Sequence, residues 1–519
     1  MKRLCKEFPP PKSSEVPMKL LTIGMDGVHA DTFNRGWTPF IKSLIDRGHG
    51  LKLHEDLISR GWSEIILGKH AYDTGALYEG PLMASSLKWS DKFKLEDVPA
   101  LGVDIKPIWQ VLNERGYRVG IMNIPTTFPA PKVDGFFVSG GGGGGPISKE
   151  ASPYQCHPTG LETELNDGGY VVDERNETLL RQAGLYDPKK FFAALDKMNA
   201  RRGAIFVQLA AKHQIDFGFL VFKSSPVITE SYLLPELEKK SRNDPTANYE
   251  FISAAEDFYR AFDAHMRILI ETYPNTEVLL VSDHSMAVRK FAVNSNAFLI
   301  EAGLQTKSRS KSGVFKAVKS FKHLLPEGFK ARLNKNPSIK SSYQSMVGFN
   351  QAQTRAFSIA YSNGTHGIYV NDSARFGGPV APDDISILSE KIVQLFNEHS
   401  LSKLHGMQSR AKGNTGTGLA AQKFPDVVLT LPDSYHTSSL FVDFVTETPL
   451  SDRRFDLYET KKDIRSVGKA HTPLAICISG KWNCKSTATS NLTVVYDHIQ
   501  QRFPALKNRQ LKSSGTPKT

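Results

Sequence analysis

The sequence has 519 residues, of which 40% are hydrophobic and 23% charged, enough for one large α/β domain with an insertion or for two or three average domains. The net charge of +12 favours anionic partners such as phosphates, nucleic acid or acidic lipids, without choosing among them. No apolar run approaches the roughly 18 residues of a membrane span, and residues 1–17 lack the apolar stretch of a signal peptide, so we expect a soluble, cytoplasmic protein.

The four cysteines form no C-x-x-C pair, which excludes a zinc ribbon and a thioredoxin-like redox motif; they are Cys5, Cys156, Cys477 and Cys484. Residues 1–17 are charged and rich in proline, and we expect a disordered lead-in there. A short apolar strand follows at 19–25 and ends in Asp26 and Gly27. Asp26 is either a metal ligand at a strand end or a capping residue for the helix expected at 38–47.

A turn at 57–60 leads into a short helix that ends at Gly68. Ser59 stands just before this helix and is therefore either its N-cap or a nucleophile beside a bound phosphate. Ser63 falls inside the helix and is the weaker nucleophile candidate.

Helical and apolar segments then alternate, as in a doubly wound α/β sheet. We expect helices at 108–116 and 251–272 and strands at 117–123 and 217–222. The six glycines at 140–145 lack the spacing of a P-loop, so we interpret them as a flexible loop. The apolar run that begins at Leu279 ends in Asp283 and His284, and this pair suits a zinc-like ion if other strand ends supply further ligands; a cap or turn is the alternative.

Beyond Met286 the alternation weakens, and we interpret 292–465 as an insertion or cap. It contains a basic segment at 307–340 with ten Lys or Arg residues and one acid, either an anion-attracting patch or a solvated helical face. The core, which comprises 18–291 and 466–505, resumes near His471, a further candidate ligand ahead of a strand at 475–479, and closes with a helix at 492–501. Residues 506–519 are expected to form a disordered tail.

Taken in order, these motifs resemble the type I phosphodiesterase/nucleotide pyrophosphatase family of the alkaline phosphatase superfamily, over about residues 18 to 505. The motifs are Asp26-Gly27, Ser59 ahead of Trp62 and Gly68, Ser282-Asp283-His284, and Gly468-Lys469-Ala470-His471. The resemblance implies an α/β fold of the alkaline-phosphatase type, with a mostly parallel, doubly wound sheet flanked by helices and an inserted cap subdomain. It also implies two divalent metal ions, usually zinc, and a Ser or Thr nucleophile.

Carried over by position, Asp26, Asp283 and His284 would hold the metal beside the nucleophile, and His471 would belong to the second site. The resemblance places an Asp and a His, four residues apart, at positions that are Pro226 and Glu230 in this sequence. Glu230 still offers oxygen ligands, whereas proline offers none, so a harder ion or weak binding is expected there. The nucleophile position matches Ile58, and Ser59 fits if the turn is one residue shorter.

The sequence therefore predicts metal-dependent hydrolysis of a phosphodiester or nucleotide pyrophosphate bond through a phosphoseryl intermediate on Ser59. The expected partner is a small phosphorylated substrate, with nucleotides among the candidates, and no stable nucleic-acid complex. The alternative is a catalytically impaired relative that keeps the fold and acts as a binding or scaffolding protein. Substrate identity and oligomeric state are left open.

Overall fold

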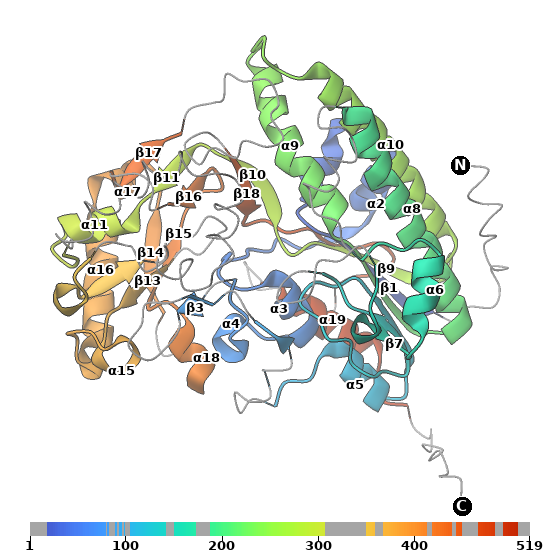
Figure 1. Ribbon diagram of the computed structural model, residues 1–519, viewed down its shortest axis with the longest axis horizontal. Helices are drawn as coiled ribbons and strands as arrows, with labels where there is room; N and C mark the ends of the chain where they lie inside the picture. Colours follow the sequence, from blue (N-terminus) through green and yellow to red (C-terminus); the bar gives the residue numbers. More distant parts are fainter. Residues whose placement is uncertain are drawn as a thin grey trace, which may run out of the picture.

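A mostly parallel sheet of eight strands forms the centre of the protein (Figure 1). The structure, a computed structural model, describes residues 18–78, 80–81, 89–90, 93–95, 98, 104–141, 150–172, 187–306, 349–358, 367–412, 418–438, 443–448, 466–482 and 491–506. The strand order is β2-β19-β9-β1-β8-β5-β6-β7. Their bounds are β1 (Leu20–Met25), β2 (His49–Gly50), β5 (Val119–Met122), β6 (Gly135–Val138), β7 (Cys156–His157), β8 (Phe217–Phe222), β9 (Glu277–Val281) and β19 (Ala475–Cys477).

The five strands β9, β1, β8, β5 and β6 run parallel, while β19 and β7 are antiparallel to their neighbours β9 and β6. The side chains of β1, β8 and β9 are apolar on both faces, because both faces are covered by helices. In β8, for example, Leu220 and Phe222 join one hydrophobic cluster, and Phe217, Phe219 and Val221 join the other. The predicted doubly wound α/β architecture is confirmed.

The two helical layers lie on opposite faces of this sheet (Figure 1). One layer contains α2 (Pro39–Arg47), α8 (Pro188–His213) and α10 (Tyr249–Glu271). The other contains α3 (Gly61–Leu67), α5 (Ile108–Glu114) and α19 (Thr493–Arg502). Each helix sends its apolar stripe onto the sheet, so the carboxyl edge of the parallel strands is left for loops and their polar side chains.

The region interpreted as an insertion has a separate, third hydrophobic cluster, and this region forms the left lobe of Figure 1. It packs a three-stranded and a four-stranded sheet against helices that include α11 and α16. The strands and these two helices are β11 (Phe291–Val293), β16 (Tyr435–Thr437), β17 (Val445–Glu447), β12 (Ala356–Ser358), β13 (Gly367–Val370), β15 (Val427–Thr430), β14 (Gln408–Ala411), α11 (Ser295–Glu301) and α16 (Ile385–Glu398).

An antiparallel ribbon of β10 (Ser285–Arg289) and β18 (Ser466–Ala470) connects the core with this lobe. The domain boundaries stay predictions. The remaining elements are η1 (Ala30–Arg35), α4 (Ala71–Thr74), β3 (Gly80–Pro81), β4 (Trp89–Ser90), η4 (Pro153–Gln155), α6 (Leu161–Asp167), α9 (Ser224–Ser241), η5 (Gln351–Gln353), α15 (Ser373–Phe376), η6 (Pro382–Asp384), α17 (Ser400–Leu404) and α18 (Gly418–Lys423).

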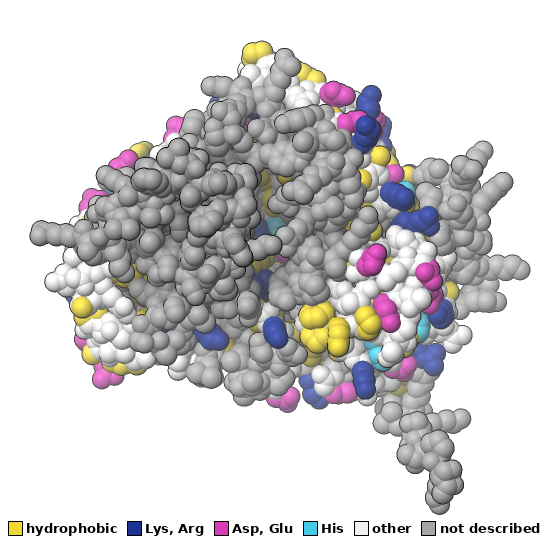
Figure 2. Space-filling view, in the orientation of Figure 1, with side chains coloured by type: hydrophobic (Ala, Val, Ile, Leu, Met, Phe, Trp, Pro, Cys, Tyr) yellow, Lys and Arg dark blue, Asp and Glu magenta, His cyan; other side chains and the backbone are white. Residues whose placement is uncertain are grey.

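Among the described residues, no helix has the length and apolar character that crossing a bilayer requires. Figure 2 shows Lys or Arg side chains interspersed with Asp or Glu over the described part of one face. The lead-in 1–17, the basic segment 307–340 and the tail from 507 onward lie outside the described residues.

Candidate metal centre and neighbouring serine

The register of β1 and β9 brings Asp26 and Asp283 to the same level of the sheet. Gly24 of β1 lies opposite Val281 of β9, and each aspartate follows two residues later at the carboxyl end of its strand. The backbone N–H of Asp26 donates to the carbonyl of Phe222 in β8, 3.2 Å away, which holds it at this edge. Two aspartates more than 250 positions apart in the sequence therefore become neighbours.

His284 completes a buried group with these two carboxylates. Its Nε2 atom lies 3.5 Å from Asp26 Oδ1 and 3.5 Å from Asp283 Oδ2. One ligand atom from each of the three residues lies within 4.8 Å of the others, and the side chains are buried. These donors match the oxygen and imidazole set of a zinc site.

The hydrogen bonds around this group favour a bound cation. His284 Nδ1 lies 2.8 Å from the Ser285 carbonyl and must donate to it, which leaves the Nε2 lone pair facing two carboxylates. Asp283 Oδ1 is buried and accepts no hydrogen bond from the described residues. Burial and the Asp26 charge raise the pKa of Asp283 well above its usual range, while burial lowers the pKa of His284. A cation would satisfy all three side chains at once.

Neighbouring groups hold the carboxylates in place. Trp62 Nε1 donates to Asp26 Oδ2 at 3.1 Å, and the Tyr78 hydroxyl donates to Asp283 Oδ2 at 3.4 Å. Helix α3 starts against Asp283 itself, because a Cβ on Gly61 would stand 2.5 Å from the Asp283 carbonyl oxygen. The partly buried ammonium of Lys469 lies 3.4 Å from the centre of the Tyr78 ring and interacts electrostatically with both aspartates.

Ser59 is fully buried and does not cap α3, whose N-cap is Arg60. Its Oγ lies 2.8 Å from His70 Nε2, which is also 2.8 Å from Asp56 Oδ2. His70 Nδ1 accepts the Tyr72 N–H, so Nε2 carries the proton and Ser59 Oγ accepts from it. The Ser59 hydroxyl proton is then available to another acceptor, and the Glu64 carboxyl group lies beside it.

The structure does not bring every predicted residue into the group of Asp26, Asp283 and His284. Within the described residues, the His, Cys, Asp and Glu side chains that converge there do not include His471. His471 Nδ1 lies 2.6 Å from the Glu55 carbonyl, and the His471 N–H donates to Asp433 at 2.8 Å. The contact with the Glu55 carbonyl directs Nε2 away from that carbonyl, the orientation that second-shell bonds give to metal-binding histidines.

Glu230 lies in a different environment. Arg35 donates to both of its carboxylate oxygens at 2.7 Å, and the Tyr259 hydroxyl donates to one of them. Glu230 raises the pKa of Arg35 above its ordinary value, against the lowering that burial alone would cause. The residue at the other family position, Pro226 in α9, has no ligand atom, so the structure does not assemble the second site from these two positions.

We expect Glu230→Gln to destabilise the protein without changing its metal content. The substitution leaves the Arg35 guanidinium without its charge partner, which should lower the free energy of unfolding by about 2 kcal/mol, because Arg35 keeps some contact with water. Chemical denaturation and metal analysis of the same sample test this. If the variant instead bound one equivalent of metal less than the wild type, Glu230 would be a metal ligand.

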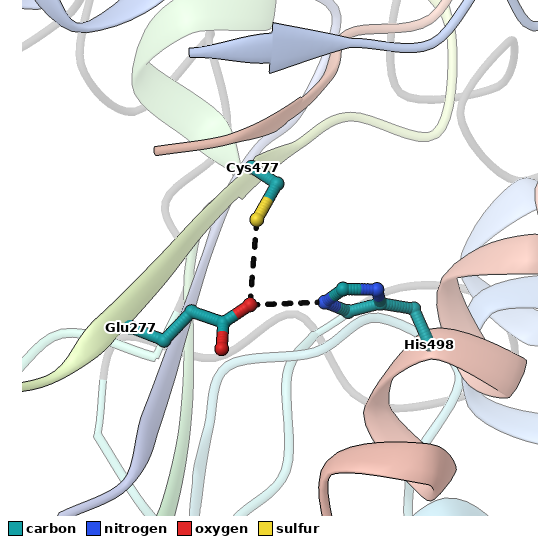
Figure 3. Close-up of side chains that lie close together, drawn as sticks. All are labelled: Glu277, Cys477 and His498. Atoms are coloured by element: carbon teal, nitrogen blue, oxygen red, sulfur yellow. Dashed lines mark hydrogen bonds and ion pairs between the residues drawn. The ribbon is translucent and has the colours of Figure 1, made fainter. Parts of the chain in front are cut away.

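A second group of residues with metal-ligand chemistry lies at the amino end of β9, where Glu277, Cys477 and His498 converge from two strands and α19 (Figure 3). Glu277 Oε1 lies 3.3 Å from Cys477 Sγ, 3.1 Å from His498 Nε2 and 3.0 Å from the Arg502 guanidinium. Burial and Glu277 raise the pKa of the Cys477 thiol to about 11, so it stays protonated. Because Arg502 already neutralises the carboxylate, we interpret this group as a structural link.

Sequence reasoning missed Glu55, Asp56, Glu64 and His70, which surround Ser59. The available signal was the pair of acids in a segment whose neighbours, Leu53 and Leu57, are apolar and buried.

No protein-family model and no curated protein matches the sequence. Among solved structures, phosphonoacetate hydrolase from Sinorhizobium meliloti 1021 in complex with phosphonoformate has a TM-score of 0.52 at 11% identity, covering 94% of this chain and 96% of that chain. The same protein with phosphonoacetate has a TM-score of 0.49 at 11% identity and the same coverage. Murine ectonucleotide pyrophosphatase/phosphodiesterase 5 has a TM-score of 0.42 at 12% identity, covering 95% and 97%. The first likeness extends over nearly the whole of both chains and concerns the fold.

Proposed function

Starting from the alkaline-phosphatase-like fold of this chain, we propose that it hydrolyses a phosphoric ester with the help of a divalent cation held by Asp26, Asp283 and His284. The observation that carries the proposal is the buried convergence of two carboxylates and an imidazole at the carboxyl edge of the sheet. Ligands of open α/β sheets bind at this edge. We extend the proposal to a phosphodiester or nucleotide pyrophosphate bond and to zinc as the cation.

A zinc-class cation would supply Lewis-acid stabilisation of charge on a phosphoryl oxygen. The chain itself supplies the nucleophile, which we assign to Ser59. His70 orients the Ser59 oxygen by donating its Nε2–H, and Glu64 stands ready to accept the hydroxyl proton. Burial raises the pKa of Glu64 to about 7, which suits a general base at neutral pH.

The covalent step balances within these groups. The Ser59 oxygen forms a bond to phosphorus as the bond to the leaving ester oxygen breaks, and the serine proton passes to Glu64. The leaving oxygen departs with the proton that Glu64 received. Water then attacks the phosphorus, its hydroxyl group stays on the released phosphate, and its other proton returns to the Ser59 oxygen. The Lys469 ammonium, next to Asp26 and Asp283, offers positive charge to a second phosphoryl oxygen.

The nature of the ligand is proposed from the site and the neighbour together. One solved neighbour is a phosphonoacetate hydrolase in complex with phosphonoformate, a small phosphorus oxyanion. A small phosphorylated substrate agrees with this chemistry and with the net charge of +12. Cytoplasmic location stays a prediction.

A catalytically impaired relative that binds a ligand or partner is the second candidate. The ion pair of Glu230 with Arg35 and the proline at 226 favour it, because the spaced Asp and His implied by the resemblance are both missing. The alternative predicts metal binding without turnover.

The experiment is hydrolysis of a p-nitrophenyl phosphodiester by zinc-loaded protein, with a p-nitrophenyl sulfate as the comparison substrate. Release of p-nitrophenol from the diester and none from the sulfate is expected. A protein that binds zinc but releases none from either compound would support the impaired relative, and preference for the sulfate would change the reaction class.

A further inference from the structure

Two glutamates lie in a buried cluster beside Ser59, separate from the group that contains His284. Glu55 and Glu64 are each only 1% exposed. Within the part of the chain that the structure describes, none of their four carboxylate oxygens has a hydrogen-bond donor in good geometry, although the Ser59 hydroxyl and the His70 ring lie beside Glu64. An unsatisfied carboxylate is among the most costly groups to bury, so two neighbouring ones require an explanation.

The nearby cations offset the charge of this pair only in part. His70 Nε2 lies 2.8 Å from both Asp56 Oδ2 and Ser59 Oγ, which share its proton, and 3.4 Å from Glu64 Oε1. The Arg60 guanidinium donates to the carbonyls of Leu77 and Tyr78. Lys469 lies against the Tyr78 ring and interacts electrostatically with Asp283 and Asp26 and, less strongly, with Glu55.

The two carboxyl groups interact strongly with each other. Burial and the mutual charge raise the pKa of Glu55 well above its usual range, and burial raises that of Glu64 to about 7. Glu55 also senses the charge of Asp283. The pair must therefore share a proton or bind a cation, and the Ser59 hydroxyl lies on the Glu64 side of it.

We propose that the carboxylates of Glu55 and Glu64, together with the Ser59 hydroxyl, bind a second divalent cation. All three donors are oxygens, so the site suits a hard ion such as Mg²⁺ or Mn²⁺. The cation would neutralise the charge that Glu55 and Glu64 place in this buried cluster, and it takes the place of the second metal expected at 226 and 230. When bound, the cation would replace the proton of the pair and would itself lower the pKa of the Ser59 hydroxyl in place of the Glu64 base; this role rests on the proposed function, whereas its binding does not.

The test is titration of metal-stripped protein with Mn²⁺ alone, with free Mn²⁺ measured by electron paramagnetic resonance. Two equivalents are expected for the wild type and one for the double variant Glu55→Gln/Glu64→Gln, with affinity at the altered site reduced at least about tenfold. Asp283→Asn should lose the other equivalent. Glu277→Gln is the matched control, because it alters the carboxylate of the separate group drawn in Figure 3. This variant should still bind two equivalents of Mn²⁺.

Thermal melting verifies that the double variant folds. Its neutral amides no longer repel each other, so without metal it should melt at or above the wild-type temperature, and Mn²⁺ should raise its melting temperature less. Two equivalents bound by the double variant would overturn the proposal. The proposal would also be overturned if the wild-type protein bound only one equivalent of Mn²⁺ and Asp283→Asn abolished that binding. Such a result would leave the proposed function intact.

Discussion

Replacing Asp283 with asparagine should reduce hydrolysis of a p-nitrophenyl phosphodiester by at least about a thousandfold, the order expected for losing the main electrostatic element of a site. Asparagine keeps the shape of the side chain and removes the negative charge that, with Asp26, attracts the cation. The group of three then retains one carboxylate and one neutral imidazole. The steady-state kcat/KM at saturating zinc measures the loss.

The matched control is Asp216→Asn, at the opposite edge of the same sheet. Asp216 accepts the Arg118 N–H at 2.8 Å just before β8, and an asparagine oxygen can do the same. This variant should keep wild-type activity. If Asp283→Asn were equally active, the cation would not be held by this residue.

Replacing Ser59 with alanine should reduce the same activity by about a thousandfold or more, because no other group would carry the phosphoryl intermediate. Alanine removes the oxygen that accepts the His70 Nε2–H at 2.8 Å and leaves the backbone bond to Asp56 in place. Trapping of radiolabelled phosphate on acid-quenched protein gives a second readout, and the label should disappear in the variant.

Ser63→Ala is the matched control in the same segment. Its hydroxyl contacts Thr126 Oγ1 at 3.3 Å and takes no part in the cluster around Ser59. Unchanged activity in Ser59→Ala together with loss in Ser63→Ala would assign the nucleophile to Ser63.

The sequence could predict the half of the site that depends on strand ends. Apolar runs that stop at Asp26 and at Asp283 identify buried parallel strands, and such strands align their carboxyl ends whatever their separation in sequence. The capping alternative for Asp26 fails because the N-cap of η1 is His29 and that of α2 is Thr38. The alternative of an N-cap at Ser59 fails for a similar reason, since the helix starts one residue later than expected.

The remaining part of the site depends on tertiary contacts that a local sequence pattern does not predict. Glu55 and Glu64 resemble surface acids in the sequence, whereas the fold buries both of them. The family position predicts Glu230 as a ligand, whereas Arg35, 195 residues away, donates to both of its carboxylate oxygens. The 26-residue helix α8 was not anticipated, because its polar residues are spread around much of the helix.

The most direct test of the cation held by Asp26, Asp283 and His284 is a zinc titration of metal-stripped protein in which bound zinc and diester hydrolysis are measured on the same samples. We predict that the metal-free protein does not hydrolyse the diester and that the rate of hydrolysis rises in proportion to the first equivalent of zinc bound. We also predict that Asp283→Asn does not bind this first equivalent. Full hydrolysis by the metal-free protein, or an unchanged first equivalent in Asp283→Asn, would contradict the account.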